Sequence, residues 1–426
     1  MKTKHAFVWG IALASSALAA PAYAAPAKPM FGDPVKVSDE LTFDPIIDLR
    51  LRYENVTQTG AAVDADAVTA RLRAGFELKH NSGLSLLAEG EGTLAIVDDY
   101  NAFPGSFSAA SVGNSHQRRP GFATVADPQN VELNRLQVQY KSKPLTVTIG
   151  RQRINLDDQR FVGSVAWRQN EQTFDAARLE GSLGPVSFDG TYAIAQRTVF
   201  GIDAGPRQSY GGDFVFLGAS AKAGPFNVKG FAYLLDYDEA IFFANSSQTY
   251  GARATGTVPL SKLVKLNLAA SYARQSRYGT NPVAYSADYL AGEAALAYKT
   301  YTVTAGYEKL GADGVAGKSF QTPMATLHKF NGWADMFLVT PATGLQDIYG
   351  GVAVKFPKVK ALPGLNAQVV YHDFKSDIGS VKLGNEWDAS VGFKLRRVGV
   401  LAKFASYDAA VGPTVNKFWL QFELAY

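Results

Sequence analysis

The chain has 426 residues, a formal net charge of +4 at pH 7 and no cysteine, and it contains 40 glycines, 26 phenylalanines and 20 tyrosines. The mildly basic balance gives no argument for nucleic-acid binding, and the lack of cysteine excludes disulfide bridges and thiolate metal sites. A chain of this size and composition without helical periodicity is typical of β architecture, either several sandwich domains or one large barrel.

Residues 1–24 have the three parts of a secretory signal peptide. They carry two lysines near the start, Lys2 and Lys4, continue with an apolar core at residues 6–20 and end in a small-x-small cleavage site, Ala-Tyr-Ala. We therefore expect a periplasmic N-terminal segment at 25–45 and a barrel at 46–426. After the signal, no stretch has the roughly 20 continuous apolar residues that a membrane helix needs.

Apolar and polar side chains alternate along much of the remaining chain. Successive side chains of a strand point to opposite faces, so each run predicts a strand with one apolar and one polar or charged face. About eighteen runs occur, near residues 46–56, 69–79, 84–97, 131–140, 145–153, 173–182, 186–195, 213–223, 226–236, 249–258, 263–275, 287–299, 301–309, 347–356, 365–375, 386–396, 399–407 and 417–426.

The connections between these runs are alternately short and long. With an even number of strands, this alternation places all long loops at one end, as in a bacterial outer-membrane barrel with short periplasmic turns and long extracellular loops. The two longest loops, at 98–130 and 310–346, are expected to fold into the lumen as a constriction and to cap the mouth, respectively.

The C-terminus carries a second signature of such a barrel. Counting back by twos from Tyr426 gives Leu424, Phe422, Leu420 and Phe418, the pattern of a lipid-facing closing strand that ends in an aromatic residue. The sequence therefore predicts an all-β fold, a single transmembrane antiparallel β-barrel of about 18 strands in the bacterial outer membrane.

Charged residues determine which face of each strand points inward. An arginine that faces lipid at mid-membrane costs about 2–4 kcal/mol, so the charged faces must line the lumen. Barrels of about 16 to 18 strands leave an aqueous channel, so the lumen should be a polar pore. Aromatic residues in the outward phase should anchor the barrel at the membrane interfaces, and an aromatic sugar-stacking track inside the lumen is the alternative. These residues are Tyr53, Phe76, Tyr140, Phe188, Tyr192, Tyr272, Tyr298, Tyr307, Trp387 and Phe393.

The most distinctive motifs lie between residues 150 and 179. They are Gly-Arg-Gln at 150–152, Asp-Gln-Arg-Phe-Val-Gly at 158–163, Trp-Arg-Gln-Asn at 167–170 and Gln-Thr-Phe-Asp-Ala at 172–176. In these motifs the chain resembles the alginate-export family of outer-membrane porins. The resemblance implies an eighteen-stranded monomeric barrel whose arginine-rich constriction passes an anionic polysaccharide or an acidic solute.

Nine arginines are the candidate substrate-binding residues. A guanidinium is always charged and binds carboxylates through a two-point fork, so a ring of arginines would guide a polyuronate. The alternative is that they pair with nearby carboxylates, brace the wall and fold a loop inward. Because Arg151 and Arg153 share the parity of lipid-facing residues, their strand should end or bulge by Gly150. The nine are Arg52, Arg71, Arg73, Arg135, Arg151, Arg153, Arg160, Arg168 and Arg178.

Loop acids at 98–99, 157–158 and 236–239 could bind calcium through carboxylate oxygens, but they lack the spacing of a dedicated calcium loop. Ordinary solvated loop acids are the favoured interpretation. The sequence thus predicts a channel without a cofactor or a metal.

Other functions remain as alternatives. A barrel hydrolase would need a nucleophile and a base on one wall, yet among the histidines only His372 has a lumen-facing parity, and no serine is near it. The favoured interpretation is a non-enzymatic, passive porin. An uptake porin for small carboxylates or oligosaccharides is the first alternative, and an adhesion or structural barrel, favoured by a lumen closed by loops, is the second. The expected partners are outer-membrane lipid, the solute and the barrel-insertion machinery, without nucleic acid.

Overall fold

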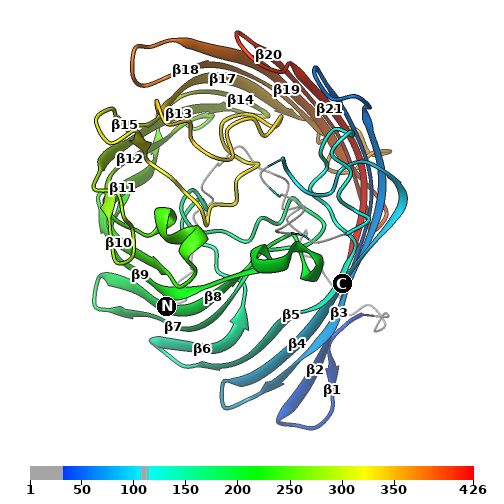
Figure 1. Cartoon of the computed structure of the whole chain (residues 1–426). Helices are drawn as coiled ribbons and strands as arrows, with labels where there is room; N and C mark the ends of the chain where they lie inside the picture. Colours follow the sequence, from blue (N-terminus) through cyan, green and yellow to red (C-terminus); the bar gives the residue numbers. More distant parts are fainter. Residues whose placement is uncertain (1–31, 106, 108–111, 113–114) are drawn as a thin grey trace.

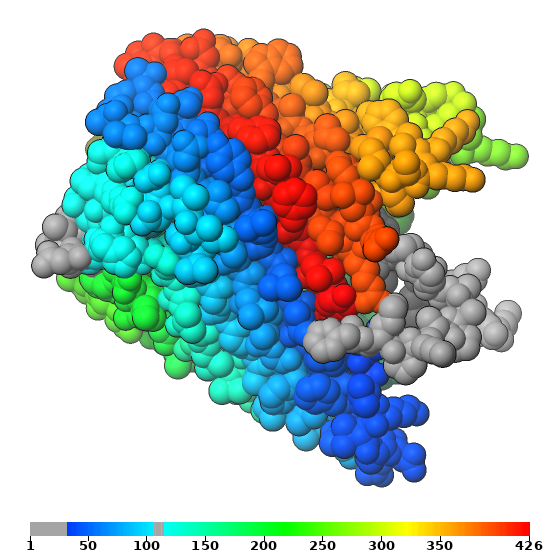
Figure 2. Space-filling model, turned by 90° about the vertical axis from the view of Figure 1, so that its right-hand side faces the viewer, coloured from blue at the N-terminus to red at the C-terminus, as the bar shows by residue number. Residues whose placement is uncertain are grey.

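The computed structural model describes residues 32–105, 107, 112 and 115–426, so the predicted signal peptide at 1–24 lies outside the described residues. In the described part of the chain, eighteen strands form a closed antiparallel barrel, seen in Figure 1 as a ring. Strand β2 (Leu41–Gln58) closes it by pairing with both β3 (Ala65–His80) and β21 (Val415–Ala425). Figure 2 shows the blue N-terminal strands beside the red C-terminal strand.

Each of the other barrel strands pairs with its neighbours in sequence. They are β4 (Leu84–Asp99), β5 (Asn130–Lys141), β6 (Leu145–Gln152), β7 (Thr173–Leu183), β8 (Val186–Arg197), β9 (Ser209–Ala223), β10 (Phe226–Tyr237), β11 (Ser247–Pro259), β12 (Val264–Arg277), β13 (Ser286–Tyr298), β14 (Tyr301–Leu310), β17 (Leu345–Lys355), β18 (Asn366–Lys375), β19 (Lys382–Leu395) and β20 (Val398–Ala409). The short elements are β1 (Val35–Lys36), which pairs with β2, the hairpin of β15 (Ala312–Asp313) and β16 (Lys318–Ser319), and the 3-10 helices η1 (Ile202–Arg207) and η2 (Ala240–Asn245). None of the helices in the described residues is long and apolar enough to span a membrane.

The predicted strands and their order are confirmed. Several strands extend beyond the alternating runs, because the antiparallel pairing continues past them, as in β2, where Leu41 already pairs with His80 of β3. Strand β2 begins at residue 41, before the predicted start at 46, and the loops expected near 57–68, 376–385 and 408–416 shorten to 59–64, 376–381 and 410–414.

The alternation of burial along each strand follows the predicted phase. In β2, Arg52 is fully buried, whereas Leu49 and Leu51 are more than 40% exposed. In β21, Trp419 is fully buried and Phe418 is 40% exposed. The apolar face of the sheet therefore points outward to lipid, and the charged face points into the lumen.

Aromatic residues occupy both faces. Four of the predicted outward tyrosines, Tyr140, Tyr192, Tyr272 and Tyr298, are more than 40% exposed. Tyr192 and Tyr272 donate hydrogen bonds to aspartates of the neighbouring strands, as expected for interfacial anchors. The inward aromatic residues are buried in packed clusters instead of lining an open track. Phe174, for example, is fully buried and packs edge-on against Phe216 of β9.

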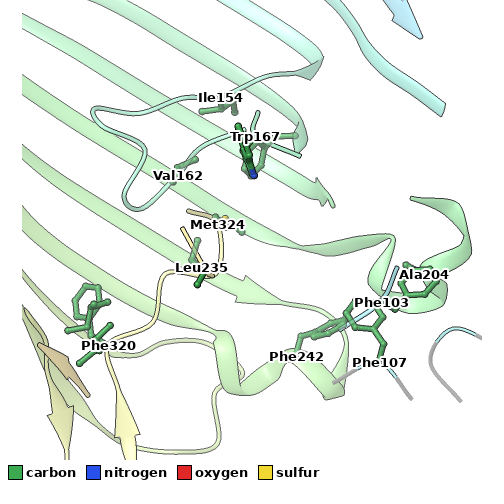
Figure 3. Close-up of a cluster of buried hydrophobic side chains, with 14 of the residues drawn as sticks. Phe103, Phe107, Ile154, Val162, Trp167, Ala204, Leu235, Phe242, Phe320 and Met324 are labelled. Atoms are coloured by element: carbon green, nitrogen blue, oxygen red, sulfur yellow. The ribbon is translucent and has the colours of Figure 1, made fainter. Parts of the chain in front are cut away.

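Long loops fold into the barrel, where Figure 1 shows them inside the ring of strands. Residues 153–172, between β6 and β7, cross the lumen: Asp157 pairs with Lys229 of β10, and Trp167 packs edge-on against Trp419 of β21. Figure 3 shows Ile154, Val162 and Trp167 of this segment near Met324 of loop 311–344. Apolar side chains thus give the inward loops a core of their own.

The two loops predicted to shape the pore also turn inward. In loop 100–129, buried Asp127 accepts a hydrogen bond from the Gln169 backbone, so this loop supports the crossing segment. Loop 311–344 was expected to cap the mouth, but it reaches further, because His328 contacts Lys403 of β20.

Candidate functional site in the barrel lumen

The crossing segment begins where β6 leaves the wall. The sequence predicted that this strand ends or bulges by Gly150, and this prediction was wrong. Gly150 has a φ of +116°, which glycine tolerates, and the pairing with β5 continues without a register shift to Arg151, opposite Leu136. Arg151 therefore stays on the wall. Arg153, one residue after the strand end, turns to Glu171.

Four arginines on the inward face of β2 and β3 form a basic wall. Arg50, Arg52, Arg71 and Arg73 are all at most 8% exposed. Such deeply buried charges require partners. Arg50 and Arg71 both contact Glu423 of β21, at 2.8 and 3.3 Å.

The basic wall holds the crossing segment by its carbonyl oxygens. The Nη1 of Arg50 donates to the carbonyls of residues 166, 167 and 168 at 3.1–3.2 Å, and the Nη2 of Arg52 donates to the carbonyl of Trp167 at 2.5 Å. The Arg52 guanidinium also lies 4.1 Å from the centre of the Trp167 ring. Charge-assisted bonds to carbonyls fix the backbone of residues 166–168 against the wall.

Not every donor of the basic wall is used. Within the described chain, Arg50 Nε and both Nε and Nη1 of Arg71 are buried without a hydrogen-bond partner. A buried donor without an acceptor costs about 1–3 kcal/mol. These three nitrogens are therefore a place where an acceptor group would be stabilised.

Glu171 joins the C-terminal end of the segment to the wall. Its carboxylate contacts Arg73 at 3.3 Å, accepts from Asn134 at 2.6 Å and also pairs with Arg153. Burial alone would raise the pKa of the Glu171 carboxyl, but Arg73 and Arg153 outweigh it and lower that pKa to about 2. Glu171 is therefore ionised at every physiological pH.

An acidic wall faces the second inward loop. Glu308 of β14, Asp347 of β17, and Glu386 and Asp388 of β19 are buried on the inner face. The backbone N–H groups of Trp333 and Ala334 donate to Asp388 and Glu386 at 3.2 and 2.7 Å. Carboxylates thus hold loop 311–344 by its N–H groups.

Arg160 links the crossing segment to this acidic wall. It bonds to Glu308 at 2.7 Å and to Asn331 at 3.0 Å, and it lies over the ring of Phe330. The segment is therefore anchored near both walls, through Arg160 at one end and through residues 166–171 at the other.

The two inward loops meet around a buried histidine. His328 stacks on Trp167 with a centroid distance of 4.4 Å, and its ring nitrogens contact Asp335 and Lys403 at 2.8 Å each. Burial, together with the nearby Lys403 and Arg168, holds the pKa of the His328 imidazole well below its usual range, although Asp335 opposes this. His328 is therefore neutral where the loops join.

Comparison with known proteins agrees with this architecture. The "Alginate export" family model matches residues 47–238. No curated protein sequence matches the chain significantly. Among solved structures, OccAB3 of Acinetobacter baumannii has a TM-score of 0.70 and 14% identity over 90% of this chain and 99% of its own. OpdQ of Pseudomonas aeruginosa has a TM-score of 0.66 and 16% identity over 90% and 98%.

Over residues 47–238 the chain matches the alginate-export family, and over 90% of its length it has the fold of outer-membrane porin barrels. A third solved structure, the outer membrane protein OpdK of Pseudomonas aeruginosa, shares the fold, with a TM-score of 0.62 and 13% identity over 90% of this chain and 99% of its own. In this porin, His372 is bonded to Asp347 and stacks on Tyr349 and Phe374, so it is part of the acidic wall.

The nine predicted site arginines of this porin fall into three groups. Six surround the C-terminal half of the crossing segment or the wall behind it, namely Arg52, Arg71, Arg73, Arg135, Arg153 and Arg168. Arg160 holds the other end. Arg151 and Arg178 lie apart, paired with Asp175 and Asp189 on the barrel wall.

The candidate site also includes residues outside the predicted set. Arg50 lies two residues before Arg52 in β2, on the same inward face. The alternation of the strand could therefore have predicted it as a site residue. Lys403 lies 4.0 Å from the Trp167 ring and 3.7 Å from the Trp333 ring, in a cage that brings together two loops and β20. Nothing in the order of the sequence indicates that these residues meet.

The loop acids considered for calcium mostly have basic partners. Asp157 and Asp158 pair with Lys229 and Arg253, and Asp98 and Asp99 pair with Arg119. Each of these pairs therefore fastens a loop to the wall or to itself.

Proposed function

We propose that this porin is a passive channel for acidic solutes, which move along the basic wall. The observation that carries the proposal is the set of unmatched donors on Arg50 and Arg71. A carboxylate accepts two parallel N–H bonds and is the group that best fits a guanidinium fork. It would also replace the carbonyl oxygens of residues 166–168 on Arg50 as the solute passes the crossing segment.

Polyuronates of the alginate type and small carboxylates both carry this group. The inward loops favour small carboxylates as the second, narrower candidate, because both 153–172 and 311–344 are fixed by buried ion pairs and a polymer would need to displace them. The fold relative OpdK has been solved with vanillate, a small carboxylate, which supports this candidate.

The test is single-channel recording of the purified porin in a planar lipid bilayer. Mannuronate oligomers of increasing length, a monouronate, vanillate and a neutral oligosaccharide of matched size are added in turn. We expect an anion-selective current that the carboxylates block and the neutral sugar does not. Block that strengthens with oligomer length supports polyuronate passage, whereas block by monouronate and vanillate alone supports the small-carboxylate channel.

A current that is cation-selective and indifferent to every carboxylate would contradict the proposal. If correctly folded protein in the bilayer gives no conductance, an adhesive or structural role would be favoured instead.

A further inference from the structure

Five lysines occupy the same kind of position at the periplasmic end of the barrel. Each lies at or within two residues of the end of its strand next to a short turn, and each has the parity of side chains that face the lumen. In β9, for example, Lys222 shares the parity of fully buried Phe214 and Phe216. In β19, Lys394 shares the parity of buried Glu386 and Asp388. The five are Lys141, Lys222, Lys265, Lys355 and Lys394.

The five strands are spread around the barrel. In the pairing order that begins with β2, they are β5, β9, β12, β17 and β19, with at least one other strand between each two. Their ammonium groups therefore surround the periplasmic mouth. We call this set the lysine ring.

The lysine ring is not neutralised by carboxylates. Among the described residues, none of the five forms an ion pair, and four of them are exposed. Lys79, which has the same position in β3, differs because it pairs with Asp44 and Glu77. Lysine is charged at neutral pH, so the ring is a permanent cationic belt around the opening.

The turns next to the lysine ring add further positive charge. The seven turn segments 141–144, 183–186, 222–226, 259–265, 299–300, 355–365 and 394–398 hold 12 lysines and arginines and no aspartate or glutamate. The extracellular end mixes both signs, as in Asp98 and Asp99 beside Arg119. Beside β3 the same end also carries acids, because Asp44 and Glu77 pair with Lys79 and Glu40 lies next to His80, so the mouth as a whole has a cationic excess. Low-dielectric walls focus the field of such an excess and raise the local concentration of counter-ions.

We propose that the lysine ring is a capture site for solutes with several carboxylates at the periplasmic mouth. Lipid headgroups would be met by outward side chains, whereas the ring has inward parity, so the solute in the lumen is the fitting ligand. The inference rests on the proposed acidic-solute channel and adds a second binding site, at the periplasmic mouth, to the one at the basic wall. Acidic solutes associate faster from the periplasmic side than from the extracellular side.

The test compares the wild-type porin with a variant in which all five ring lysines are replaced by glutamine. The matched control removes five turn lysines instead, Lys143, Lys262, Lys299, Lys358 and Lys360, also by glutamine. Because the chain has no cysteine, Ala361→Cys in every variant marks the orientation of each inserted channel by thiol labelling from one side. Oligomannuronate is then added to either side in low salt, and its association rate is measured from current blocks.

In the wild type we expect faster association from the periplasmic side, and in the ring variant a fall of about tenfold or more from that side only. The control should lose much less, and high salt should abolish the difference because it shortens the screening length. A second measurement needs no uronate: with the dilute side of a KCl gradient at the periplasmic mouth, the ring variant should lose anion selectivity.

The possible outcomes test the lysine ring independently of the proposed acidic-solute channel. Equal rates from both sides, or an unchanged ring variant, would overturn the ring while block in the wild type leaves the acidic-solute channel standing. A loss in the turn control as large as in the ring variant would also overturn it. Absence of uronate block from either side rejects the acidic-solute channel, and an unchanged selectivity in the KCl gradient then rejects the ring separately.

Discussion

The basic wall of the lumen binds its loop through backbone carbonyl oxygens, whereas the acidic wall binds its loop through backbone N–H groups. Arginines of β2 donate to carbonyls of residues 166–168, and carboxylates of β19 accept from the N–H groups of residues 333 and 334. Among the described residues, each wall also keeps buried groups without a hydrogen-bond partner: donors on Arg50 and Arg71, and acceptors on Glu386 and Asp388. Loop docking therefore uses only part of each wall, and under the proposed function the remaining groups would select solutes by charge.

The largest effect should follow from breaking the basic wall at Arg52. Arg52→Ala leaves buried Asp127 without this partner and removes the contact with Trp167, so docking of the crossing segment should weaken by about 3–5 kcal/mol. Released loop residues should increase single-channel conductance and speed hydrogen exchange of amides 165–171. The control is Arg178→Ala, which breaks an ion pair on the wall without a loop contact. Equal behaviour of the two variants would refute loop docking by the basic wall.

A smaller effect should follow from crowding the acidic wall at Gly332. Its φ is +82°, and an added Cβ would lie 2.3 Å from Glu386 Oε2. Gly332→Ala should therefore push residues 331–335 off the wall, with strain on the order of 1–3 kcal/mol. Gly317→Ala in the same loop is the matched control, since it has a φ of +64° but open space around it. Proteolysis within loop 311–344 should accelerate in the first variant only, and similar rates in both would count against the clash.

The smallest effect should come from pH, acting where the two loops meet. The pKa of His328 is held well below its usual range in the docked state, while a released imidazole titrates near 6.5. The released state thus binds more protons, and docking is full above about pH 6.5 and weakens as the pH falls below it. Glu171, with its pKa lowered to about 2, weakens docking only in more acidic solution, below about pH 4.3.

Conductance should therefore rise between pH 7 and pH 5 in the wild type, and this step should disappear in His328→Gln. His80→Gln, at an exposed periplasmic turn, should retain the step. A step that survives in His328→Gln would assign it to another group.

The strands were predictable because a period of two and the cost of a charge in lipid both act locally. Arg71 and Arg73 could be placed in the lumen from their neighbours alone, whereas Arg151 keeps an outward parity because β6 continues past Gly150. The site itself depends on contacts between residues far apart in sequence. Arg168 touches Glu54 and Asp335, and no local pattern encodes such distances.

One further signal was present in the sequence. Trp419 has the inward parity of the closing strand, opposite to Phe418, and a large aromatic residue facing a polar lumen requires a packing partner. That partner is Trp167 of the crossing segment. The parity of Trp419 could thus have predicted an apolar anchor for an inward loop, although not its identity.

The most direct test of selection by the two walls is the reversal potential of two variants under the same KCl gradient. Arg50→Gln with Arg71→Gln neutralises part of the basic wall, and Glu386→Gln with Asp388→Asn neutralises part of the acidic wall. We predict that the first pair shifts the reversal potential toward cation selectivity and the second shifts it toward anion selectivity. Shifts in the same direction, or no shift in the arginine variant, would contradict a channel in which the basic wall selects acidic solutes.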